Sequence, residues 1–112
     1  MSKALLKELR FKISEEYDLN EFNLNSLDST FSKGLELENY EYIKDDFKSL
    51  FGIPFSKNIV LQYNGDILFS VIFSFNQIYF DKLESEIKKY SSNEFSVELF
   101  IEDKSNCKIV VR

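Results

Sequence analysis

The clearest pattern of hydrophobic and polar positions lies between residues 59 and 75, where two apolar runs flank Asn64-Gly65. Both runs are rich in β-branched and aromatic side chains, and Asn-Gly is a strongly favoured two-residue loop of a β-hairpin. The pattern therefore predicts two antiparallel strands joined at Asn64-Gly65. A loop of that length pairs Tyr63 with Asp66, Leu61 with Leu68 and Val60 with Phe69. Because both faces of the second strand are rich in apolar residues, we expect helices on both sides of it.

Three other stretches have the spacing of amphipathic helices, with apolar residues every three or four positions. They are Ser2–Tyr17, Asn39–Phe51 and Tyr79–Ser91. The second is the most regular, because Gly52 follows it as a favoured helix end and Pro54 cannot continue a helix. Between the first two we expect a short helical turn opened by a capping box at Asp18–Glu21 and then irregular chain.

Alternating apolar and polar residues near the end of the chain predict a second hairpin, with strands at 95–102 and 107–111 around a turn at 103–106. The fold class that follows is α+β. N-terminal helices are followed by a β-hairpin, a helix and a second β-hairpin, and a four-stranded, mostly antiparallel sheet packs against the helices. The helix between the two hairpins should form a right-handed crossover.

The composition is that of one folded domain spanning residues 1–112, with 44% hydrophobic residues and a net charge of −5. A single cysteine, Cys107, rules out a disulfide within the chain, and we interpret it as a buried apolar side chain. The N-terminus has no uninterrupted apolar core of a signal peptide, and no apolar run is long enough to cross a membrane. We therefore expect a cytoplasmic protein.

The residues give no support to an enzyme, a metal site or a cofactor site. The chain contains no histidine, which removes the commonest general base and metal ligand. Its three glycines are isolated, so no phosphate-binding loop is present. Adjacent carboxylates at Asp45 and Asp46 match the spacing of no calcium loop. We expect a protein without catalytic activity.

Charge is distributed unevenly along the chain. From Ser14 to Asp46 there are ten acidic residues and two lysines, a net charge of −8, whereas the remainder is slightly basic. On a helix over Asn39–Phe51 the acids would share the face opposite the apolar stripe, with a tyrosine at its centre as an interface anchor. The candidate partner-binding residues are Glu38, Glu41, Tyr42, Asp45 and Asp46, with Glu15, Glu16, Asp18 and Glu21 as a second patch.

An acidic surface repels nucleic acid and attracts basic proteins, many of which bind nucleic acid themselves. In its composition the chain is similar in character to bacterial immunity proteins that neutralise toxic nucleases. The leading hypothesis is a stoichiometric inhibitor of a basic protein such as a nuclease toxin. The alternatives are a nucleic-acid mimic that blocks a defence or anti-defence complex, of the anti-CRISPR or anti-restriction type, and a homo-oligomeric structural subunit. We expect a monomer or a weak homodimer.

Overall fold

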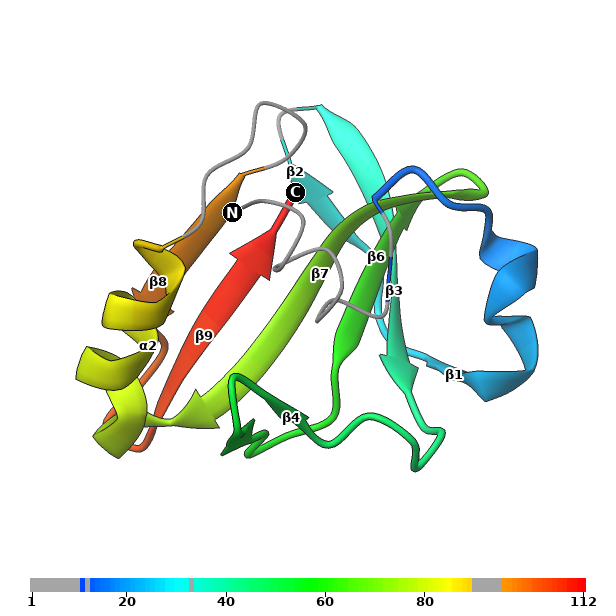
Figure 1. Cartoon of the computed structure of the whole chain (residues 1–112). Coiled ribbons are helices and arrows are strands. Elements are labelled where there is room, and N and C mark those ends of the chain that lie inside the picture. The colour runs from blue at the N-terminus through cyan, green and yellow to red at the C-terminus, as the bar shows by residue number, and fades with distance from the viewer. Residues whose placement is uncertain (1–10, 12, 33, 90–95) are drawn as a thin grey trace.

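The computed structural model of the chain describes residues 11, 13–32, 34–89 and 96–112. Within these ranges seven strands form one antiparallel sheet, two further strands form a small hairpin, and one α-helix packs against the sheet (Figure 1). The elements, with η for a short 3-10 helix, are η1 (Tyr17–Leu19), η2 (Glu21–Asn23), β1 (Leu24–Ser26), β2 (Thr30–Ser32), β3 (Leu35–Tyr42), β4 (Ser49–Leu50), β5 (Ile53–Pro54), β6 (Val60–Asn64), β7 (Ile67–Asn76), η3 (Gln77–Tyr79), α2 (Phe80–Ile87), β8 (Val97–Ile101) and β9 (Asn106–Val111).

The strands lie in the order β1-β3-β6-β7-β9-β8. β1 pairs with the second half of β3, and β2 pairs with its first half on the same side. β3, β6 and β7 follow one another as neighbours, although the small β4–β5 hairpin interrupts the chain between β3 and β6. After β7 the chain passes through η3 and α2 to β8 and returns as β9, which fills the place between β7 and β8. β8 is therefore the edge strand on this side, with α2 beside it (Figure 1).

The central hairpin forms as predicted, but its loop is shifted by one residue. Asn64 pairs with Ile67, so the loop consists of Gly65 and Asp66, and Gly65 has a φ of +63° that suits a residue without a side chain. A bulge at Gln62 and Tyr63 then moves the register further. The observed pairs are Tyr63 with Leu68, Leu61 with Val71 and Val60 with Ile72, in place of the predicted ones.

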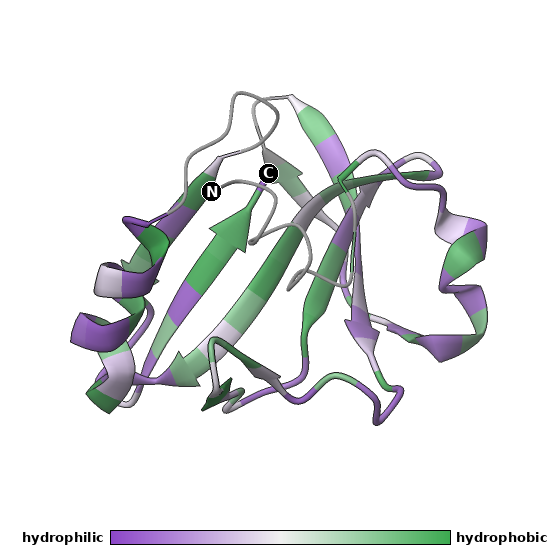
Figure 2. Ribbon diagram, in the orientation of Figure 1, coloured by the Kyte–Doolittle hydropathy of each residue, from purple (hydrophilic) through white to green (hydrophobic). Residues whose placement is uncertain are grey.

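The core lies on the face of the sheet that α2 covers. Most of its strand residues come from β6, β7 and β9, which Figure 2 shows as the most apolar part of the fold. They are Leu61, Tyr63, Leu68, Val71, Phe73, Phe75, Cys107, Ile109 and Val111, and Cys107 is buried as predicted. The core also includes Tyr42 of β3, Leu83 of α2, Leu50 and Ile53 of the β4–β5 hairpin, and Phe11 and Ile59. Burying a side chain such as Leu83 contributes about 2 kcal/mol, which is why this short helix is held in place.

The helix predicted over Asn39–Phe51 does not form. Residues 35–42 are the long strand β3, residues 43–48 are a connection with a turn, and Gly52 lies in the turn of the β4–β5 hairpin. Strand is favoured here because β3 pairs on both sides, with β6 on one and with β1 and β2 on the other. These long-range hydrogen bonds outweigh the local helical spacing, as tertiary context commonly does.

The predicted fold class is also wrong in its strand number and in its N-terminal helices. The sheet has seven strands in place of four, because β1, β2 and β3 arise in the stretch read as helix and irregular chain. Most of the helix predicted over Ser2–Tyr17 lies outside the described residues, and residues 13–16 are not helical. Two 3-10 turns follow, η1 and η2, and neither has a side-chain cap, so the capping box is absent.

The helix and the second hairpin predicted for the last part of the chain are present. α2 forms within the predicted stretch with η3 preceding it, and β8 and β9 form the second hairpin. Among the described residues, helices on both sides of β7 are not observed, since α2 and the core side chains lie on one face. Within the described ranges no helix has the length and apolar character needed to cross a membrane.

Candidate protein-binding surface

The segment that precedes η1 runs alongside the β6–β7 turn and is tied to it by backbone hydrogen bonds. The Tyr17 N–H donates to the Asp66 carbonyl at 2.7 Å, and the Leu68 N–H donates to the Glu15 carbonyl at 2.8 Å. Glu16 forms a single antiparallel bridge with Ile67. Two parts of the chain that are distant in sequence are thereby fixed side by side.

This pairing creates an open hollow of about 430 Å³, which we call the acidic hollow. Its lining consists of three carboxylates, one aromatic ring and one exposed aliphatic side chain. The lining residues are Glu16, Asp18, Asp66, Tyr17 and Ile67. Carboxylates beside an aromatic face and an apolar surface suit the side chain of lysine or arginine, whose charged end needs an anion and whose stem is apolar.

Two large apolar side chains that follow Asp18 closely in the sequence project into solvent. Leu19, at the end of η1, is 67% exposed, and Phe22, in η2, is 92% exposed. Their sequence neighbours Asp18 and Glu21 are exposed acids. Scattered exposed apolar residues are ordinary on a protein surface, but an aromatic residue beside charged groups is a frequent anchor in protein–protein interfaces. We call the acidic hollow together with Leu19, Glu21 and Phe22 the η1–η2 surface.

Three tyrosines support this surface from beneath. The rings of Tyr17, Tyr40 and Tyr63 contact one another, with centroids 5.2 to 5.7 Å apart. Tyr63 is fully buried, and burial raises its pKa. The Tyr40 hydroxyl donates to Glu38 Oε2 at 3.1 Å, and burial together with Glu38 raises the pKa of Tyr40 to about 12. The packed rings hold Tyr17 and Glu38 in fixed positions.

The acids of the η1–η2 surface differ from the other acids in their surroundings. The ion pairs between described residues involve Asp45, Asp46, Glu84, Glu86, Glu98 and Glu102, which all lie elsewhere. None of those ion pairs includes Glu16, Asp18, Glu21 or Asp66. Acids of one surface that form no ion pair with another described residue produce a local negative potential that attracts a cationic partner.

The predicted face of Glu38, Glu41, Tyr42, Asp45 and Asp46 does not exist, because these residues are not on a helix. Glu38 and Glu41 are three positions apart on β3, so their side chains lie on opposite faces of the sheet. Tyr42 is buried in the core, with 4% exposure and its ring against Phe11, and cannot serve as an exposed anchor.

Asp45 and Asp46 lie in the turn after β3, where nearby groups already contact them. Lys48 Nζ is 2.6 Å from Asp45 Oδ1, and Lys44 Nζ is 3.6 Å from Asp46 Oδ2. The Tyr42 hydroxyl also donates to Asp46 at 2.8 Å. These two acids are locally neutralised, so they add little to the negative potential of the protein.

The second predicted patch corresponds more closely to the observed geometry. Glu16 and Asp18 line the acidic hollow, Glu21 follows in η2, and Glu15 accepts a hydrogen bond from Asn20 Nδ2 at 3.3 Å. Sequence reasoning missed Asp66 and Ile67, which the central hairpin contributes. Phe22, in the stretch predicted as irregular chain, is in solvent. The polar sequence around Phe22 is the only signal that could have indicated its exposure.

A second hollow, of about 160 Å³, lies between the β3–β4 connection and the segment before β6. Phe47 and Phe55 form part of its wall, and its other residues include Lys44, Lys48 and Lys57. Each lysine contacts a carboxylate, and the Lys57–Glu102 distance is 2.6 Å. The cavity has room for a single small group, and its cations are already paired, so we do not assign it as the principal site.

The described residues contain no group of acidic, cysteine or histidine side chains that could hold a metal ion, so the three carboxylates of the acidic hollow do not form a metal centre. Their arrangement suits an organic cation on a flexible stem. Comparison of the chain with protein-family models, with curated proteins and with solved structures found no match.

Proposed function

We propose that this chain is a non-enzymatic inhibitor that binds one basic protein, such as a nuclease toxin, in the bacterial cytoplasm. The proposal rests on one observation: the η1–η2 surface combines three carboxylates lining a hollow with two exposed apolar side chains. A basic residue of the partner would enter the acidic hollow, and an apolar pocket of the partner would receive Phe22.

The two halves of this surface would contribute differently to binding. Exposed carboxylates raise the association rate with a basic partner, and this effect decreases as salt is added. Apolar anchors slow the dissociation of the complex, because their side chains return to water only when the complex opens. Inhibition of a nuclease is a natural result, since a nuclease is basic where it binds its phosphate substrate.

The experiment that tests the proposal is affinity capture from a lysate of the source cell, at low and then moderate salt. Three baits are compared: the wild type, Asp18→Lys with Asp66→Lys, and a control with the same charge change, Asp45→Lys with Glu84→Lys. We expect the wild-type and control baits to retain one basic protein through moderate salt. The hollow variant should lose it, and the purified partner should be inhibited at one equivalent of the wild type.

Other outcomes lead to different conclusions. Equal capture by all three baits would exclude the acidic hollow as the binding site. Capture of several unrelated nucleic-acid-binding proteins, each displaced by DNA or RNA, would instead support a nucleic-acid mimic. Proteins that wash off all three baits as salt is raised would indicate nonspecific charge attraction and contradict a dedicated inhibitor.

A further inference from the structure

β8 forms the edge of the sheet, and its backbone polar groups alternate in direction. Ser96 and Arg112 exchange two backbone hydrogen bonds, at 2.8 and 3.0 Å, and Glu102 N–H donates to Asn106 O at 3.0 Å. Because the register between these points is regular, Glu98 and Phe100 direct their N–H and C=O groups at β9. The same groups of Val97, Leu99 and Ile101 therefore point away from the sheet.

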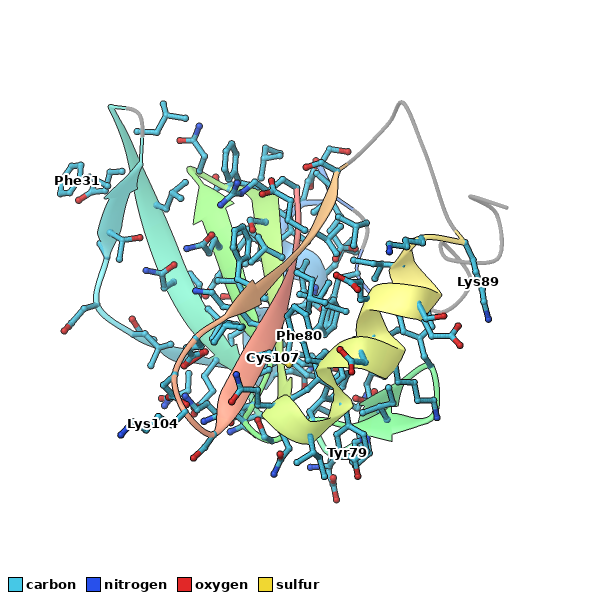
Figure 3. All side chains as sticks on the ribbon, turned by 90° about the vertical axis from the view of Figure 1, so that its left-hand side faces the viewer. Phe31, Tyr79, Phe80, Lys89, Lys104 and Cys107 are labelled. Atoms are coloured by element: carbon cyan, nitrogen blue, oxygen red, sulfur yellow. The ribbon has the colours of Figure 1, made fainter. Side chains whose placement is uncertain are left out.

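These outward-pointing groups are not paired within the described part of the chain, since β8 has β9 as its sole partner strand there. Figure 3 looks onto this edge and shows β8 at the front of the sheet with α2 to one side. Unpaired backbone groups in a row are a template for another strand.

β8 also lacks several of the features with which proteins protect an open edge. Its sequence, VELFI, contains no lysine and no proline, and its pairing with β9 has no bulge. Its one charged residue, Glu98, lies 3.5 Å from Arg112 Nη1 on the same sheet. Phe100 is 37% exposed and Ile101 is 61% exposed, so the edge combines free hydrogen-bonding groups with apolar side chains.

We propose that β8 pairs antiparallel with β8 of a second copy of this chain, with Leu99 opposite Leu99. The three residues whose backbone N–H and C=O groups point away from the sheet fix this register, because Leu99 lies midway between Val97 and Ile101. With Leu99 on the two-fold axis, Val97 of each copy is opposite Ile101 of the other, and all outward-facing N–H and C=O groups are satisfied. Any other antiparallel register leaves at least one outward-facing residue of each strand unpaired.

The side chains are compatible with this symmetric arrangement. On the core face, the apolar row of Ile109 and Leu99 continues across the junction into the same row of the second copy. On the opposite face, Glu98 of each copy is opposite Phe100 of the other, so the two carboxylates do not meet. The two-fold axis is perpendicular to the joined sheet and places both α2 helices on one face, where they extend a single apolar layer.

The edge is distinct from the η1–η2 surface, because β8 and β1 lie at opposite ends of the strand order. The dimer would therefore present two η1–η2 surfaces and does not depend on the proposed inhibitory function. A strand of another protein could use the same backbone groups, but a second copy supplies a strand of the same length and apolar character on which the two Glu98 carboxylates do not face each other.

The first measurement is the mass in solution over a series of protein concentrations, by light scattering or sedimentation. We expect the wild type to rise from 13.2 kDa toward twice that mass. Leu99→Pro removes an outward N–H that β9 does not use, and should remain monomeric. Since proline could impair folding, Ile101→Lys provides a second variant, with Phe31→Lys on β2 as a matched control at another exposed apolar site.

A monomeric wild type at all concentrations would overturn the proposal, and so would a dimer that persists in folded Leu99→Pro and Ile101→Lys. Amide hydrogen exchange tests the register. The amides of Val97, Leu99 and Ile101 should become protected as the concentration rises, while those of Glu98 and Phe100 are protected at every concentration. A dimer without this alternation would show that another surface forms the contact.

Discussion

The hydroxyl of Tyr42, at the end of β3, donates a 2.8 Å hydrogen bond to Oδ1 of Asp46 in the following turn. Tyr42 is buried, so the bond connects the core to a turn on the surface. Replacing Tyr42 by Phe keeps the ring and removes the bond, which should lower the free energy of unfolding by about 0.5–1.5 kcal/mol. Urea unfolding measures the change, and Asp46→Asn, which retains an acceptor oxygen, should cost less. Wild-type stability in Tyr42→Phe would mean that the bond contributes nothing to folding.

The bond between Tyr40 and Glu38 leads to a prediction at alkaline pH. The pKa of Tyr40 is raised from 10.0 to about 12, first by burial and then by Glu38. A raised pKa means that the neutral phenol is favoured in the folded state, so its contribution to stability is complete below pH 10 and is lost as the pH rises through about 12. Tyrosinate absorbance, with Tyr40→Phe to identify the signal, measures this pKa.

The carboxylate of Glu38 is the second cause of that shift, so a Glu38→Gln variant separates it from burial. The pKa of Tyr40 should decrease in this variant but remain above 10.0, because burial is the larger cause. An ordinary tyrosine pKa in the wild type would mean that Tyr40 is solvated, and would remove the packed tyrosines as the support of the η1–η2 surface.

Gly65 offers a test of the central hairpin. Its φ is +63°, and a Cβ built on it would meet no atom within 4 Å, so the cost of a side chain there comes from the backbone alone. Gly65→Ala should destabilise the protein by about 1–2 kcal/mol, whereas Gly65→Asn should cost less because asparagine tolerates this conformation. Thermal or urea unfolding of both variants measures the order. Equal stability of the alanine variant and the wild type would show that the loop adopts another turn.

The sequence predicted the elements whose information is local. The apolar runs around Gly65 and the helical spacing of Phe80, Leu83 and Ile87 each lie within one short segment, and both elements are present. The position of the loop was predicted one residue early, because Asn64 has a strand partner in Ile67 that only the folded sheet provides. A bulge likewise arises from how two strands twist together.

β3 could not be read from its own sequence. Leu35 and Leu37 alternate with acids, but Asn39 and Glu41 continue the same face, so no clean period of two is visible. What makes the segment a strand is its pairing with β6, whose partner residues lie 19 to 25 positions later in the sequence. The acidic hollow also depends on a contact between distant parts of the sequence. Glu16 forms a single backbone bridge with Ile67, and Ile67 directly follows Asp66 in the sequence.

Phe22 provides the sharpest test of the η1–η2 surface, because its role in folding and its role in binding should separate. Its side chain is almost wholly in solvent, so Phe22→Ser should change the free energy of unfolding by no more than about 0.5 kcal/mol. If Phe22 anchors a partner, the same variant should weaken binding at least tenfold, about 1.4 kcal/mol, mainly through faster dissociation. Surface plasmon resonance with the captured partner measures both rates. Phe31→Ser is the control, since Phe31 is also exposed but lies on β2, outside the η1–η2 surface. Equal losses in the two variants would mean that exposed aromatics bind the partner nonspecifically, whereas a loss confined to Phe22→Ser would place the partner at η2.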